Sequence, residues 1–228
     1  MSTFASVLEA PPRRRPEQRK GGRVPPPPPP PPDGDGPDRD PGSRPPILDN
    51  ARLATLVLIG GEVMLFAGLI SSYLVLRMTA AVWPPPLQPR LPVAVTGVNT
   101  LVLLASSVAM IAAGRALARR DRRAHIAHLR LTAAFGALFL LVQGYEWIRL
   151  IGFGLTLSSG SYGTAFYSLI GTHALHVVGA LAWVAITLGM ASRGRFDHGR
   201  GNVARACAMY WHFVVALWPV LYVAVYLV

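Results

Sequence analysis

Five apolar stretches, each long enough to cross a lipid bilayer, occupy most of the chain after residue 50. They are Leu53–Leu76, Val93–Ala113, Leu131–Leu150, Gly163–Met190 and Cys207–Val228. A helix needs about 20 apolar residues to span about 30 Å of hydrocarbon. Backbone polar groups inside a bilayer must bond to one another, which only helices and closed β-barrels achieve. Because the stretches lack the ten-residue alternation of barrel strands, the sequence predicts a helical membrane protein.

The predicted fold is all-α, a polytopic membrane protein whose five transmembrane helices form one bundle. We expect a disordered Pro/Arg-rich cytoplasmic tail over residues 1–46 and a membrane domain over 47–228, with spans near 53–76, 93–113, 131–150, 163–190 and 207–228. The tail holds the proline run Pro25–Pro32, which favours extended polyproline II, and has little apolar surface with which to fold. Docking of the tail to a proline-binding partner is the alternative interpretation. No apolar segment precedes Leu53, so a cleaved signal peptide is not expected.

The distribution of cationic residues predicts how the chain is oriented. The net charge of +11 would favour nucleic-acid binding in a soluble protein, but here the cations gather on alternate sides of the spans. The tail together with Arg52 just after it, the segment between spans two and three, and the segment between spans four and five carry 19 of the 22 Lys and Arg residues; the remaining three are Arg77, Arg90 and Arg149. Cationic loops stay in the cytoplasm. We therefore expect a cytoplasmic N-terminus, an outer C-terminus and no nucleic-acid partner.

Five ionisable residues lie at membrane depth, where charge is costly and each such group needs an explanation. They are Glu62, Glu146, His173, His176 and His212. Glu62 starts a helical face with Phe66, Leu69 and Tyr73, so its carboxyl should face other helices and be neutral or hydrogen-bonded. A structural carboxyl that holds neighbouring helices together is favoured over a proton relay, although both interpretations stay open.

The histidines favour packing roles over a metal or haem site. His173 and His176 stand three residues apart and share one helical face, whereas membrane haems usually bind histidines of different helices. No carboxylate-rich helix pattern completes a di-iron site, and Cys207 is the only cysteine, so a disulfide within the chain or a cysteine metal cluster is excluded. We expect no catalytic, cofactor-binding or metal-binding residue in this chain.

Several ordered motifs resemble subunit III of the haem–copper terminal oxidases, in its shorter, five-helix bacterial form. The matching strings are Gly61-Glu-Val-Met-Leu-Phe-Ala-Gly68, Trp83-Pro-Pro, Asn99–Ser107, Gln143-Gly-Tyr-Glu146, Tyr162–Tyr167, Gly171–Gly179 and Tyr210-Trp-His-Phe-Val214, followed by Trp218 and Leu221-Tyr222. The family's intramembrane glutamate falls on Glu62. The resemblance covers residues 50–228. The chain departs from the family's pattern at Val215, where the family usually has an Asp. Pro219 also interrupts the last span.

The resemblance implies a non-redox core subunit of a proton-pumping cytochrome c oxidase in aerobic respiration. Such a subunit would lie in the bacterial inner membrane, contact oxidase subunits I and II and membrane lipids, and support subunit I and its proton uptake. Haem and copper would belong to the partner subunits, and bound phospholipid is a further candidate. The alternatives are the equivalent subunit of a quinol oxidase, an accessory subunit of a nitric oxide reductase and, more distantly, a small transporter or a haem-bearing membrane cytochrome.

Overall fold

Five long helices account for nearly all of the computed structural model, which describes residues 50–85, 91–194 and 201–227. The helices are α1 (Asn50–Thr79), α2 (Val93–Ala118), α3 (Arg122–Gly152), α4 (Ser161–Ser192) and α5 (Gly201–Tyr222), and α5 continues as a π-helical turn over Val223–Leu227. These residues include no strand, so the predicted all-α fold is confirmed. The predictions for the tail, residues 1–46, lie outside the described residues.

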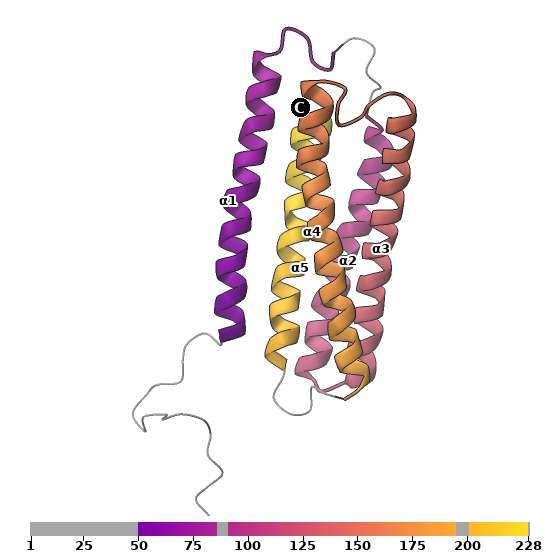
Figure 1. Cartoon of the computed structure of the whole chain (residues 1–228). Coiled ribbons are helices and arrows are strands. Elements are labelled where there is room, and N and C mark those ends of the chain that lie inside the picture. The colour runs from indigo at the N-terminus through magenta and orange to yellow at the C-terminus, as the bar shows by residue number, and fades with distance from the viewer. Residues whose placement is uncertain (1–49, 86–90, 195–200, 228) are drawn as a thin grey trace, which may run out of the picture. The chain divides into compact units, whose positions relative to one another are not determined.

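Helices α2, α3, α4 and α5 form a ring in which each helix packs against the next, and α5 closes the ring against α2. Helix α1 joins from one side, where it packs against α4 and α5 (Figure 1). All five are long and apolar enough to cross a membrane. Most of α1 is left uncovered by the other helices, since only Thr55, Phe66 and Tyr73 of this helix are buried.

Large aromatic side chains of α5 fill the centre of the ring. Trp211 and Trp218 are both fully buried, and each indole N–H donates to a hydroxyl on α2: Trp218 to Thr100 at 2.8 Å and Trp211 to Ser106 at 3.2 Å. Buried indole N–H groups normally need such a partner. Space for one of these rings comes from Gly136 on α3, where an added Cβ would lie only 2.6 Å from Cη2 of Trp211.

Polar groups hold the helices at both ends of the bundle. At one end, the Arg122 guanidinium donates to the carbonyls of Ala191 (3.1 Å) and Ser192 (2.6 Å) in the last turn of α4. A cation at this position satisfies free carbonyls and opposes the negative end of the helix dipole. At the other end, Tyr222 donates to the carbonyl of Val93 at 3.0 Å, which joins α5 to the start of α2.

Pro219 lies inside α5, and the helix continues past it to Tyr222. Proline has no amide hydrogen, so the carbonyl four residues earlier, that of Val215, loses its usual helical partner. Val215 itself is buried. Where the resemblance leads us to expect an Asp, this chain thus places an apolar side chain inside the bundle.

Candidate functional site

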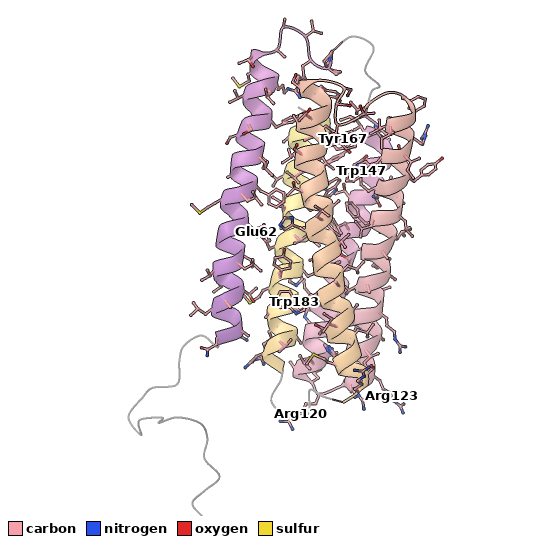
Figure 2. All side chains as sticks on the ribbon, in the orientation of Figure 1. Glu62, Arg120, Arg123, Trp147, Tyr167 and Trp183 are labelled. Atoms are coloured by element: carbon pink, nitrogen blue, oxygen red, sulfur yellow. The ribbon has the colours of Figure 1, made fainter. Side chains whose placement is uncertain are left out.

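An acid–base pair joins α1 to α4. Nε2 of His176 lies 2.7 Å from Oε2 of Glu62, and the two side chains are only 17% and 15% exposed. Figure 2 shows Glu62 on the side of α1 that faces α4 and α5. Glu62 therefore faces other helices, and its nearest titratable partner comes from a helix more than 100 residues further along the chain.

The other ring nitrogen of His176 has a hydrogen-bond partner of its own. Nδ1 of His176 lies 2.7 Å from the carbonyl oxygen of Thr172, one turn earlier on α4. A carbonyl can only accept, so Nδ1 carries a hydrogen. A neutral imidazole with its hydrogen on Nδ1 presents a bare Nε2 to Glu62. The bond to Thr172 thus fixes the orientation of the ring, with Nε2 directed at the carboxyl of Glu62.

His173 lies one turn from His176 but has a different environment. It is 1% exposed, and neither ring nitrogen has a hydrogen-bond partner among the described residues. Its ring stacks on Trp218 of α5, with 5.0 Å between centroids and 26° between planes. Phe66 of α1 makes edge contacts with both histidines, at 6.3 Å from His173 and 5.1 Å from His176. His173 thus packs as an aromatic ring, whereas the sequence favoured a hydrogen-bonded histidine.

His212 and Glu146 lie in two other places. Nδ1 of His212, on α5, is 2.6 Å from Oγ of Ser107 on α2. Among the described residues, no hydrogen bond or ion pair joins His212 to Glu62 or His176. Glu146 is buried on α3, and its Oε1 is 3.4 Å from Nη1 of Arg149 on the same helix. The structure therefore brings together Glu62, His176 and the neighbouring His173, and keeps the other two apart.

The sequence did not predict the hydrogen-bond partners of two histidines, Thr172 for His176 and Ser107 for His212. The Thr172 carbonyl is four residues before His176, which is the usual helical spacing, but a backbone group leaves no signature in the sequence. The contact between Ser107 and His212 joins residues 105 positions apart. Only the packing of α2 against α5 reveals it.

The described residues contain no group of three or more His, Cys, Asp and Glu side chains that could hold a metal ion. Cys207 is buried on α5. The Glu62–His176 pair can tie α1 to the ring of helices through a polar contact that is largely shielded from solvent. These are the roles of a buried polar contact in a multi-pass membrane protein, the class that the five apolar helices define.

Comparison with known proteins identifies the family. The family model described as "Cytochrome c oxidase subunit III" matches residues 44–228, which include all five helices. "Probable cytochrome c oxidase subunit 3" of Mycobacterium leprae is 34% identical over 181 residues, covering 77% of this chain and 87% of that protein. "Cytochrome c oxidase subunit 3" of Synechocystis is 31% identical over 180 residues (78% and 76%), and that of Sus scrofa is 33% identical over 181 residues (77% and 68%).

The chain belongs to the cytochrome c oxidase subunit III family. The resemblance drawn from its motifs is confirmed, and the chain is a subunit of an oxidase complex that includes other subunits. The quinol oxidase, nitric oxide reductase, transporter and cytochrome alternatives are not favoured, since the curated relatives above carry the name of one oxidase subunit.

Proposed function

We propose that this chain is a non-redox core subunit of the oxidase, one that buttresses subunit I and supports its proton uptake while subunits I and II carry the haem and copper. The observation that carries the proposal is the family match across residues 44–228. The Glu62–His176 pair supports it further, because a polar contact between helices stabilises a membrane protein without any redox chemistry.

The proposal is tested by purifying the complex through an affinity tag on this chain. We expect subunits I and II to co-purify, with haem and copper in the complex and reduction of dioxygen by electrons from cytochrome c. The separated chain should carry no stoichiometric haem or copper in visible spectra and metal analysis. One tightly bound haem per chain, lost in His176→Ala, would overturn the proposal in favour of a cytochrome.

We further propose that the chain lies in a bacterial inner membrane with its N-terminus in the cytoplasm. Arginines at the turn between α2 and α3 support this orientation, because cationic loops remain inside. Figure 2 shows Arg120 and Arg123 at the end of the bundle where these two helices join. Reporter fusions near Arg122 and Arg200 should report the cytoplasm, and a fusion near Pro85 the outer side. If the fusions placed the Arg119–Arg123 cluster on the outer side of the membrane, the proposed orientation would be wrong.

A further inference from the structure

His212 on α5 uses only one of its two ring nitrogens inside the bundle. Its Nδ1 lies 2.6 Å from Oγ of Ser107 on α2, the helix that packs beside α5 (Figure 1). Its Nε2 has no hydrogen-bond partner among the described residues. The side chain is partly exposed, and Nε2 is not buried, unlike both ring nitrogens of His173. A polar atom of His212 is therefore accessible at the surface of the bundle.

This polar atom lies deep within the membrane span. His212 follows the start of α5 at Gly201 by 11 residues, about 16 Å of helix, and precedes the end of its π-helical turn at Leu227 by 15 residues, about 22 Å. Its partner Ser107 lies 11 residues before the end of α2 at Ala118. A helix of about 40 Å exceeds the hydrocarbon layer by only about 5 Å at each end. The two side chains thus lie inside the hydrocarbon.

The exposed side chains around Ser107 and His212 are apolar. On α2, Leu104 and Ile111 share a helical face with Ser107, and both are exposed. On α5, Ala216 stands one turn after His212 and is also exposed. Lipid hydrocarbon covers apolar side chains well, but it offers no hydrogen bond to Nε2. Because an unpaired polar atom at this depth is costly, this face of α2 and α5 needs a polar partner.

The bond between Ser107 and His212 defines what that partner must offer. A hydroxyl can donate to Nδ1 or accept from it, so Nε2 either carries a hydrogen or presents a lone pair. Hydroxyl and amide side chains both donate and accept, and they satisfy either form. Ala216, next to the histidine, is small, and small residues let helix backbones approach closely in a membrane. These features suit a second transmembrane helix.

We infer that the face of α2 and α5 around His212 is a docking surface for a transmembrane helix of another oxidase subunit, one that places a hydroxyl or amide side chain opposite Nε2. The inference rests on the proposed function, because the partner helix comes from the oxidase complex. His212 forms the contact between subunits, and Ser107 positions its ring. Neither residue belongs to the Glu62–His176 pair.

A photoreactive amino acid in place of Ala216 tests which molecule covers this surface. Membranes that contain the whole complex are irradiated, the chain is purified through its affinity tag, and mass spectrometry identifies what is cross-linked to it. We expect a transmembrane peptide of another subunit. The same photoreactive amino acid in place of Val98, an exposed residue on the α3 side of α2, should not yield that peptide.

Two amide substitutions of His212 distinguish its two ring nitrogens. In His212→Asn the short side chain places its amide near the position of Nδ1, so the bond to Ser107 is retained and the group at Nε2 is lost. In His212→Gln the longer side chain reaches the position of Nε2. As detergent is raised, His212→Asn should lower the ratio of the other subunits to the tagged chain about three- to tenfold, and His212→Gln should retain the wild-type ratio. Ser107→Ala keeps the imidazole and should lower the ratio less than His212→Asn.

Three results would overturn the inference. They are cross-links from position 216 to lipid alone, cross-links to a second copy of this chain, and equal retention of the other subunits by His212→Asn and the wild type. In each case subunits I and II still co-purify with the wild-type chain, so the proposed function stands. Absence of both subunits from the wild-type preparation would refute the proposed function and the inference together.

Discussion

Glu62 on α1 and His176 on α4 approach each other across two helices, with 2.7 Å between Oε2 and Nε2. Because His176 Nδ1 donates to the Thr172 carbonyl, its other ring nitrogen is left to face the Glu62 carboxyl. Burying two ionisable groups together at membrane depth costs less than burying either one alone among apolar side chains. The contact therefore links α1 to the ring of helices.

Two substitutions of Glu62 distinguish a structural role of this side chain from a role in proton transfer. Glu62→Gln retains an N–H that can donate to the bare Nε2 of His176, so we expect assembly and dioxygen reduction to continue. Glu62→Leu leaves Nε2 unpaired at a cost of about 1–3 kcal/mol and should loosen α1, seen as lower thermal stability of the complex. Met64→Leu, at an exposed position of α1, is the matched control.

One result would contradict a supporting role for Glu62. If Glu62→Gln assembles normally but abolishes dioxygen reduction, Glu62 belongs to an obligatory proton path. Oxygen consumption by equal amounts of assembled complex, measured for Glu62→Gln and Met64→Leu, distinguishes the two accounts.

Gly136 is expected to be the least replaceable glycine of α3. In Gly136→Ala the new Cβ would lie 2.6 Å from Cη2 of Trp211, and the ring is fixed by its bond to Ser106. Overpacking of this kind costs about 1–3 kcal/mol, so the complex should unfold at a lower temperature. Gly144→Ala is the control, since nothing lies within 4 Å of its added Cβ; an equal loss in both variants would contradict the packing argument.

Arg122 should matter more to stability than Arg123, its neighbour. Both side chains are exposed, but Arg122 donates to two carbonyls at the end of α4, and Arg123 makes no such bond among the described residues. Arg122→Gln should therefore destabilise the complex by about 1–2 kcal/mol, and Arg123→Gln should change it little. Thermal unfolding of both variants in the same detergent measures the difference, and equal stabilities would rule out the proposed clamp.

The sequence predicts the helices well because a bilayer imposes one length and one composition on every span. The spans expected at 53–76, 93–113, 131–150 and 163–190 lie inside α1 to α4, and the helices extend further at their polar ends. Which side chains contact one another across helices could not be predicted from the sequence to the same degree. Helical periodicity places Glu62 with Phe66 on one face, but only the packing of α1 against α4 selects His176 over His173 as its partner.

The surroundings of the buried His173 are a second feature that could not be predicted from the sequence. The sequence favours a hydrogen-bonded packing histidine, because a polar ring in a membrane normally needs a partner. In the structure the ring is held by its faces and edges, against Trp218 and Phe66. Such aromatic contacts join three helices and have no spacing rule along the chain, so they emerge only from the three-dimensional packing.

The two intramembrane glutamates should differ in their reaction with a hydrophobic carbodiimide, which modifies a protonated carboxyl in lipid-like surroundings. Glu62 faces an imidazole inside the bundle, whereas Oε1 of Glu146 lies 3.4 Å from the guanidinium of Arg149. We expect labelling at Glu62 and little at Glu146, with the label located by mass spectrometry of digested complex. His176→Leu leaves Glu62 among apolar side chains without its polar partner, so labelling at Glu62 should persist in this variant. Equal labelling of the two glutamates in the wild type, or none at Glu62, would contradict the expected difference.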